Sequence, residues 1–217
     1  REQTMTDLQQ LYTAILEGNA PAAKSTVQAA LDEGVDPQEL LSKYMIPAMD
    51  EVGRLFEANE YFVPELLIAA RAMKGALEIL RPKLVESGAK PVGKVVIGTV
   101  RGDLHDIGKN LVAAMLEGGG FEVIDLGVDV SPEKFVEAVK DKGAQIIAMS
   151  ALLTTTMPGM RATVEAVEQA GLKGAVKVMV GGAPVTQRYA DEIGADGFSD
   201  NASGAVRVAR ELVGTGK

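Results

Sequence analysis

Residues 94–108, Lys-Val-Val-Ile-Gly-Thr-Val-Arg-Gly-Asp-Leu-His-Asp-Ile-Gly, decide the fold of the second half of this chain. The first seven form an apolar run that is typical of a buried strand in a parallel sheet. Residues 107–117 then have a helical composition, so the sequence places His105 in a loop at the carboxyl end of a strand. Open α/β sheets bind their ligands at that edge.

His105 is the only histidine among 217 residues, and Asp103 precedes it by two positions. A histidine that ligates a metal usually donates its other ring N–H to a carboxylate, which fixes the tautomer. Asp103 is close enough in sequence to be that partner. No second histidine and no cysteine completes a conventional metal site. On spacing alone, a solvated loop histidine is therefore an equally good interpretation.

The second half of the chain alternates between strand-like and helical segments. We expect strands at 94–100, 121–126, 145–150, 176–181 and 196–199, and helices near 107–117, 132–142, 157–171, 184–194 and 201–213. Five such units predict a parallel sheet that is covered by helices on both faces. The flavodoxin-like, doubly wound order of strands is the preferred topology.

The first half, residues 1–88, has no strand-like alternation and contains well-punctuated helices. Thr6 and Gln9 resemble a capping box at the start of a first helix. Asn19, followed by Pro21, has the features of an N-cap that opens a second helix. This half is therefore expected to be all-helical.

Two further helices are expected at 36–58, with a kink or break before Pro47, and at 64–86. Four helices predict a small antiparallel bundle. Residues 87–93, rich in glycine and proline, form the linker to an α/β domain at 89–217. The predicted fold is thus a helical bundle followed by a five-stranded flavodoxin-like domain.

Composition excludes several classes of protein. Hydrophobic residues make up 47% of the chain, which argues against disorder. The formal charge of −8 argues against nucleic acid or an anionic membrane surface as the main partner. The absence of cysteine excludes disulfides and thiolate metal sites. No stretch approaches a signal peptide or a membrane span, so a cytoplasmic protein is expected.

Small or hydroxylated residues also mark the ends of the third and fourth expected strands. Together with Gly98 in the first strand, they are Ser150, Thr154, Thr156, Gly181 and Gly182. Glycine in a buried strand weakens packing unless something approaches the backbone closely, so we expect a slot that a ligand fills. An ordinary turn explains Gly181-Gly182 equally well, and Thr156 also suits the N-cap of the next helix.

Other ligand chemistries fit this sequence poorly. No GxGxxG opens the helix after the first strand, and no GxxxxGK[ST] phosphate loop is present. Ser150 lacks the GxSxG frame of a serine hydrolase. The lysine that phosphorelay receivers carry after a later strand is missing. What remains is a metal-bearing small molecule that is held by one histidine.

Three short motifs at the strand ends resemble the cobalamin-binding motif of B12-dependent methyltransferases and mutases: Asp103-x-His105-x-x-Gly108, Ser150-x-Leu152 and Gly181-Gly182. Residues 52–65 resemble the helical cap module that precedes the cobalamin domain in methionine synthase. A chain of cap plus cobalamin domain is similar to the stand-alone corrinoid proteins of anaerobic methyltransferase systems for methylamines, methanol, methoxylated aromatics or betaines. The resemblance covers nearly the whole chain.

This resemblance implies that His105 is the lower axial ligand of cobalt, replacing the dimethylbenzimidazole of the cofactor (base-off, His-on), while Asp103 holds its other nitrogen. Thr156 stands where the family often has a serine that completes this relay. Phe56 and Val63 would cover the reactive upper face of the corrin, although both also suit the core of a helical bundle. The other implied cofactor contacts are Gly98, Asp106, Ile107, Gly108, Ser150, Leu152, Thr154, Gly181 and Gly182.

The implied function is that of a methyl carrier, which alternates between methylcobalamin and cob(I)alamin. Its partners would be a substrate-specific methyltransferase, an acceptor methyltransferase acting on a folate or thiol, and a reductive activase. The chain would be one subunit of a methyltransferase system, not a complete enzyme alone, with its cap moving about residues 87–93. The alternatives are a B12-dependent sensor, which needs an output module, and the cobalamin subunit of a mutase, which lacks this cap.

Overall fold

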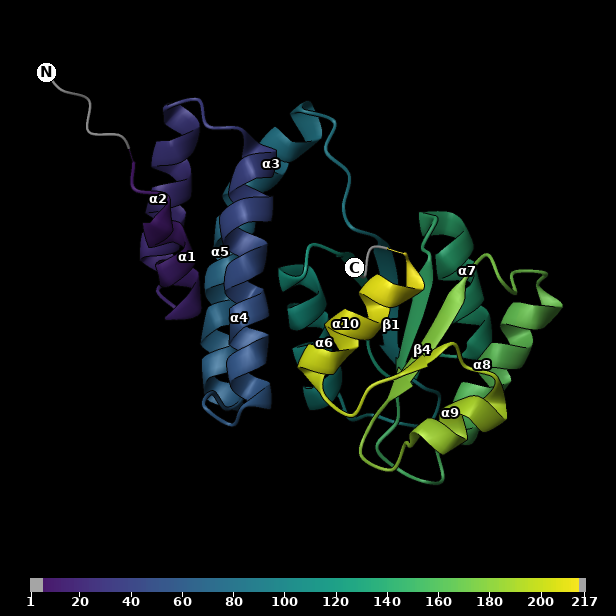
Figure 1. Ribbon diagram of the computed structural model, residues 1–217. Helices are drawn as coiled ribbons and strands as arrows, with labels where there is room; N and C mark the ends of the chain where they lie inside the picture. The colour runs from purple at the N-terminus through teal and green to yellow at the C-terminus, as the bar shows by residue number, and fades with distance from the viewer. Residues whose placement is uncertain (1–5, 215–217) are drawn as a thin grey trace, which may run out of the picture. The chain divides into compact units, whose positions relative to one another are not determined.

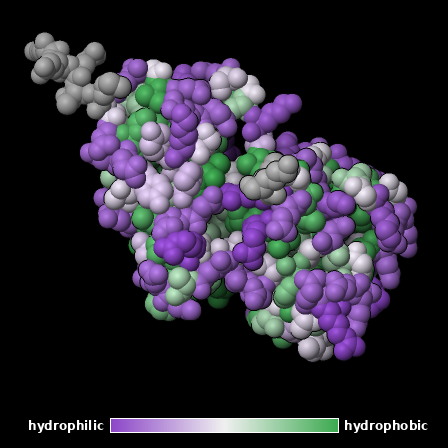
Figure 2. All heavy atoms as spheres, viewed as in Figure 1, coloured by the Kyte–Doolittle hydropathy of each residue, from purple (hydrophilic) through white to green (hydrophobic). Residues whose placement is uncertain are grey.

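The computed structural model describes residues 6–214, which fall into two compact units (Figure 1). Residues up to Lys90 belong to a helical unit, with which Glu117–Gly120 are grouped. Residues from Pro91 onward otherwise form an α/β unit. Figure 2 shows a face on which hydrophilic residues predominate and apolar residues gather in small groups. None of the helices described is long and apolar enough to cross a membrane.

The helical unit is the predicted bundle. Its elements are α1 (Gln9–Leu16), α2 (Ala20–Asp32), the short α3 (Pro37–Glu39), the π-helical turn η1 (Leu40–Met45), α4 (Ile46–Glu57) and α5 (Val63–Glu86). Large apolar side chains from all the long helices are fully buried between them, among them Leu11, Val27, Met49, Leu66 and Met73. This burial stabilises the unit, since helices as short as α1, α2 and α4 are marginal in isolation.

The caps of the first two helices differ in how well the sequence predicted them. The Asn19 side chain accepts a 3.1 Å hydrogen bond from the backbone three residues later, as expected of an N-cap. The capping box at Thr6 is wrong, because the backbone N–H and hydroxyl of Thr6 bind the carboxylate of Glu33 at 2.9 and 2.8 Å. The side chain of Asp7, in its place, accepts from the N–H of Gln9.

The break expected before Pro47 takes the form of the π-helical turn η1. The N–H of Ile46 donates to the carbonyl of Leu41, five residues back. Pro47 has no N–H and occupies one of the first positions of α4, where an α-helix tolerates proline. The chain thus passes from η1 into α4 without leaving a helical path.

The α/β unit contains five β–α pairs in the predicted order along the chain. The strands are β1 (Lys94–Thr99), β2 (Glu122–Asp125), β3 (Ile146–Ser150), β4 (Lys177–Gly181) and β5 (Gly197–Phe198). The helices are α6 (Ile107–Gly118), α7 (Pro132–Lys142), α8 (Pro158–Gln169), α9 (Gln187–Ile193) and α10 (Ala202–Leu212). Helices α6 and α10 cover one face of the sheet and α7, α8 and α9 the other (Figure 1).

The sheet has the strand order β2-β1-β3-β4-β5 with all pairs parallel, which confirms the flavodoxin-like topology. Its register aligns the ends of the three central strands. Thr99 pairs with Ser150, and Ser150 pairs with Gly181. The loops that follow these strands therefore leave the sheet side by side at one edge.

Candidate functional site

The loop between β1 and α6 carries a buried carboxylate at this edge. Asp103 is only 1% exposed, although its neighbours on both sides are exposed. Buried carboxylates require hydrogen-bond partners, because desolvation strongly disfavours an isolated charge. Partners are supplied by its own loop and by the loop between β3 and α8.

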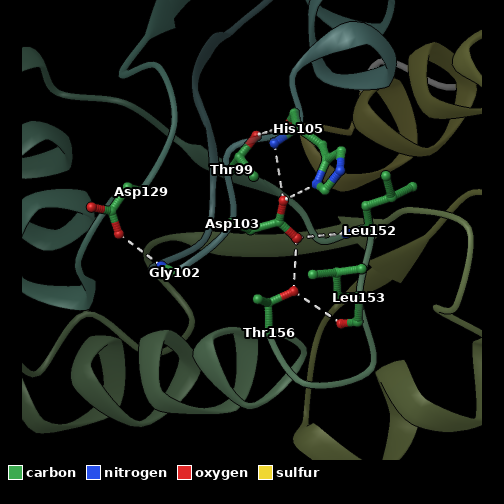
Figure 3. A network of polar contacts seen from close by, with 8 residues as sticks. All are labelled: Thr99, Gly102, Asp103, His105, Asp129, Leu152, Leu153 and Thr156. Atoms are coloured by element: carbon green, nitrogen blue, oxygen red, sulfur yellow. Dashed lines mark hydrogen bonds and ion pairs between the residues drawn. The ribbon is translucent and has the colours of Figure 1, made fainter.

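Asp103 accepts four hydrogen bonds (Figure 3). Its Oδ1 accepts from the backbone N–H of His105 at 3.0 Å and contacts Nδ1 of the same ring at 2.8 Å. Its Oδ2 accepts from the N–H of Leu152 at 2.8 Å and from the hydroxyl of Thr156 at 2.7 Å. The structure thus brings together His105, Asp103 and Thr156, which the sequence analysis grouped as a relay.

These contacts set the charge of the carboxyl group. Burial alone would raise the pKa of Asp103, but hydrogen bonds from Leu152, His105 and Thr156 lower it well below its usual range. Asp103 is therefore an anion near neutral pH and can only accept hydrogen bonds. The Nδ1 of His105 must then carry a proton, which leaves the lone pair of a neutral ring on Nε2.

The imidazole of His105 lies at the surface. Its side chain is 52% exposed, and in Figure 3 the ring edge with Nε2 points away from Asp103. Four large apolar side chains are also exposed, three in the same two loops and one at the start of α6: Leu104 at 72%, Leu152 at 41%, Leu153 at 44% and Ile107 at 83%. Several exposed apolar side chains in loops that also carry a polar group are typical of a ligand site.

The glycines at this edge have different roles. An added Cβ at Gly182, whose φ is +131°, would lie 1.9 Å from the carbonyl oxygen of Ala151, so the backbones of two loops meet there. Gly181 faces the carbonyl oxygen of Ser199, at 3.0 Å from an added Cβ. At Gly108, by contrast, an added Cβ would meet nothing within 4 Å.

The expectation that a ligand fills the space beside Gly98 is wrong. An added Cβ there would lie 2.9 Å from the ring of Phe135 and 3.0 Å from Val130. Side chains of the α/β unit itself occupy that space, and Gly98 allows them to pack against β1.

Of the remaining predicted residues of the α/β unit, Asp106, Thr154 and Ser150 are at least partly accessible, whereas Thr156 is buried. Asp106 is exposed and accepts a 3.2 Å hydrogen bond from the side chain of Asn110. Thr154 is exposed, and Ser150 is partly buried at the end of β3.

Thr156 does not cap α8, because the N-cap position belongs to Met157. Its hydroxyl is used for Asp103 and for the carbonyl of Leu153, at 2.9 Å.

Phe56 and Val63 lie in the helical unit, near the end of α4 and at the start of α5. Phe56 is partly buried and Val63 is 41% exposed, so neither belongs to the core of the bundle. The neighbouring Phe62 and Leu67 are 59% and 47% exposed. The start of α5 therefore presents apolar side chains outward, which the sequence analysis identified only at Val63.

Sequence reasoning missed three residues that support the loop carrying His105. The buried hydroxyl of Thr99 donates to the carbonyl of His105 at 2.8 Å. Asp129 contacts the same loop at Gly102 (Figure 3). Lys109, three residues into α6, has a side chain that is only 2% exposed. Within residues 6–214, no group of three or more histidine, aspartate or glutamate side chains gathers to hold a metal ion.

Two family models, both described as a B12 binding domain, match this chain. One covers residues 93–207 and the other residues 7–81. The first spans the α/β unit with the Asp103–His105 loop, and the second lies within the helical unit.

The chain is similar along nearly its whole length to corrinoid proteins. It is 45% identical to dimethylamine corrinoid protein 1 of Methanosarcina acetivorans, over 95% of this chain and 97% of that one. A cobalamin-binding protein from Desulfitobacterium hafniense has a similar structure, with a TM-score of 0.79, 36% identity, and coverage of 95% and 98%.

A chain of the methanol:cobalamin methyltransferase complex from Methanosarcina barkeri is also similar. Its TM-score is 0.84 at 29% identity, with 99% of this chain and 81% of that chain covered. The matched domains and the extent of these similarities agree with the geometry around His105. The chain belongs to the family of B12-binding corrinoid proteins, whose cofactor is cobalamin.

Proposed function

We propose that this chain is a corrinoid methyl carrier that binds cobalamin base-off and His-on, with His105 as the lower ligand of cobalt. One observation carries the proposal. The Nδ1 of His105 is held by a buried, anionic Asp103, while its Nε2 faces outward from an exposed ring. A ligand nitrogen oriented by a carboxylate behind it is the usual arrangement at a metal.

The residues at this edge fit a corrin. One imidazole nitrogen suffices for a metal that the corrin already surrounds. The exposed side chains of Leu104, Ile107 and Leu152 provide an apolar bed for a flat macrocycle. The open space beside Gly108 would let the corrin approach the backbone closely. We further propose that Ser150, Thr154, Gly181 and Gly182 line the slot for the nucleotide tail, and that Asp106 contacts the cofactor.

Cobalamin, when bound, supplies a cobalt centre that accepts a methyl group and gives it up. The residues of this chain would hold and shield that centre. His105 would offer Nε2 to that centre, and Asp103 would keep the proton of the ring on Nδ1. The hydroxyl of Thr156 stabilises the anionic form of Asp103. The exposed apolar side chains of these loops would keep water away from the bound group.

The proposal assigns the upper face to the helical unit. Phe56 and Val63 would cover the methyl group there, and residues 87–93 would act as the hinge that uncovers it. The exposure of Val63 and its apolar neighbours at the start of α5 supports an apolar contact for this surface.

The proposed partners are a substrate-specific methyltransferase as donor, an acceptor methyltransferase that acts on a folate or thiol, and a reductive activase. Similarity to a dimethylamine corrinoid protein and to a chain of a methyltransferase complex supports the first partner. The donor substrate we propose is a methylated amine.

Absorption spectroscopy tests the proposal. Wild-type protein, His105→Ala and the control Asp141→Asn, at an exposed position of α7 outside the proposed site, are reconstituted with hydroxocobalamin, desalted and compared. We expect wild type and the control to retain stoichiometric corrinoid with the same spectrum. The His105→Ala protein should show the spectrum of a cofactor that lacks the imidazole ligand. A well-folded wild-type protein that elutes colourless contradicts cobalamin binding, and identical spectra in all three contradict ligation by His105.

A further inference from the structure

The loop between β2 and α7, residues 126–131, lies directly beside the loop that carries His105. Its backbone continues the pairing with β1. The N–H of Thr99 donates to the carbonyl of Gly127 at 3.0 Å, and the N–H of Val130 donates to the carbonyl of Thr99 at 3.0 Å. The hydroxyl of Thr99 in turn holds the carbonyl of His105. The β2–α7 loop and the His105 loop therefore share one anchor residue.

Asp129 binds the His105 loop twice, on the side that precedes the histidine. Its Oδ1 accepts from the N–H of Gly102 at 2.7 Å (Figure 3). Its own N–H donates to the carbonyl of Asp103 at 3.0 Å. Asp129 adopts a left-handed backbone conformation, with φ of +51°. Residues other than glycine rarely adopt this conformation, and aspartate and asparagine are the usual exceptions.

A second contact holds the side that follows the histidine. The Nζ of Lys109 lies 2.5 Å from Oδ2 of Asp125, the last residue of β2, and 2.7 Å from Oδ1 of Asn110. The other oxygen of Asp125 accepts from the N–H of Gly127 at 2.8 Å. This ion pair ties the start of α6 to the start of the β2–α7 loop. The backbone around His105 is thus fixed on both sides, while its ring is half exposed.

We infer that the β2–α7 loop positions His105 for cobalt, and that Asp129 is its principal positioning residue. This inference rests on the proposed ligation by His105. Asp129 holds the backbone of Gly102 and Asp103, and the Asp103 carboxylate holds the imidazole. A shift of that backbone should move the ring, because the Asp103–His105 contact is 2.8 Å long and the Asp103 side chain is buried.

Two substitutions at Asp129 separate positioning from backbone strain. Asp129→Gly removes the side-chain acceptor and adopts a positive φ without strain, so the fold is kept. Asp129→Asn keeps an acceptor oxygen for Gly102 and tolerates the same conformation. Loss of a hydrogen bond to a charged group corresponds to about a tenfold change or more in an equilibrium. We expect Asp129→Gly to weaken ligation by that factor and Asp129→Asn to restore most of it.

The experiment is a double-mutant cycle on cobalamin binding. Equilibrium dialysis gives the dissociation constant of hydroxocobalamin for wild type, Asp129→Gly, His105→Ala and the double variant. We expect Asp129→Gly to raise the constant about tenfold in the wild-type background and to have little effect once His105 is gone. An effect of equal size in both backgrounds overturns the inference, because Asp129 would then not act through His105. Unchanged binding by Asp129→Gly also overturns it.

Electron paramagnetic resonance of the reduced, cobalt(II) protein provides a second readout. A nitrogen ligand splits the cobalt signal, and wild type should show this splitting. Absence of splitting in wild type contradicts the proposed ligation itself and not the role of Asp129. With splitting present in wild type, we expect Asp129→Gly to lose part of it and Asp129→Asn to retain it. Full splitting together with wild-type affinity in Asp129→Gly excludes a positioning role.

Discussion

The hydroxyl of Thr156 donates a 2.7 Å hydrogen bond to Oδ2 of Asp103, although 53 positions separate the two residues in the chain. This contact joins the loop after β3 to the loop after β1. It completes the shell of donors around a carboxylate that is shielded from water. The stability of the α/β unit and the orientation of His105 therefore depend on the same few hydrogen bonds.

Replacing Thr156 tests how much this contact contributes to the free energy of unfolding. Thr156→Val keeps the shape of the side chain but leaves a buried carboxylate without one donor, so we expect a loss of about 1.5–3 kcal/mol in the free energy of unfolding. Thr156→Ser keeps the hydroxyl and loses one methyl group, which costs about 1 kcal/mol. Urea unfolding of the cofactor-free proteins at neutral pH measures both. Equal stabilities of the two variants would contradict this account.

Asp103 makes part of the stability depend on pH. Burial by itself would raise the pKa of Asp103, but its hydrogen bonds hold the pKa below that of the unfolded chain, which is about 4. The stabilisation is therefore complete above about pH 4 and is lost as the pH falls further, toward the folded-state pKa.

The variant Asp103→Asn removes this titration. It should be less stable than wild type at pH 7, by roughly 2 kcal/mol or more, because an amide cannot accept at every position that the carboxylate uses. The difference should shrink as the pH is lowered from 4 to 2. Urea unfolding at a series of pH values measures the two slopes, and parallel slopes would show that Asp103 does not contribute.

Two glycines beside the proposed cofactor should respond in opposite ways to alanine. Gly182→Ala places a Cβ 1.9 Å from a backbone oxygen at a positive φ, so we expect a loss of about 3 kcal/mol or more in stability. Gly108→Ala meets open space within α6 and should stabilise the helix by about 0.5–1 kcal/mol.

The same pair separates folding from cofactor binding. If Gly108 admits the corrin, Gly108→Ala weakens cobalamin binding while leaving the fold intact. Thermal unfolding of the cofactor-free protein and equilibrium dialysis with hydroxocobalamin measure the two properties. A stable Gly108→Ala protein with undiminished affinity would remove Gly108 from the site.

Replacing Asp125 in its ion pair with Lys109 should cost more stability than replacing Lys109. The Lys109 side chain is 2% exposed, whereas that of Asp125 is 41% exposed. Asp125→Ala leaves a buried ammonium without its anionic partner, and we expect a cost of about 3 kcal/mol or more. Lys109→Met removes the charge from the interior and leaves Asp125 in contact with water, so its cost should be about 1 kcal/mol. Chemical denaturation of both variants measures the two losses of unfolding free energy. A larger loss in Lys109→Met than in Asp125→Ala would contradict this explanation.

Much of the architecture could be predicted because it follows from periodicity. The apolar runs at 94–100 and 145–150 correspond to β1 and β3, and the helices between strands begin and end within a few residues of their expected bounds. The positions of Thr99, Ser150 and Gly181 at one edge also follow, since parallel strands of similar length end together. Local pattern is sufficient for such features.

Features that depend on distant partners could not be predicted. Thr6 pairs with Glu33, 27 residues away, in preference to the local capping box. Gly98 accommodates Phe135, a contact that only the packed sheet reveals. Asp129 reads as an ordinary loop residue, because neither its left-handed backbone nor its bond to Gly102 leaves a sequence signal. The pairing of Asp103 with His105 follows from their spacing in the sequence, whereas Thr156 could be added to it only because the motif resembles that of a known family.

The π-helical turn η1 allows one more residue between two buried sides of the helical unit than an α-helix would. Leu40 is buried at its start, and Met49 is buried in α4 after it. Each hydrogen bond of the turn spans five residues, whereas those of an α-helix span four, so each residue turns the chain by less than the roughly 100° of an α-helix. Removal of one exposed residue, such as Ser42 or Lys43, should therefore convert the turn to α-helix and keep the apolar side of α4 facing the core. The π-helical turn thus stores a spare residue that the chain can lose without changing which side of α4 is buried.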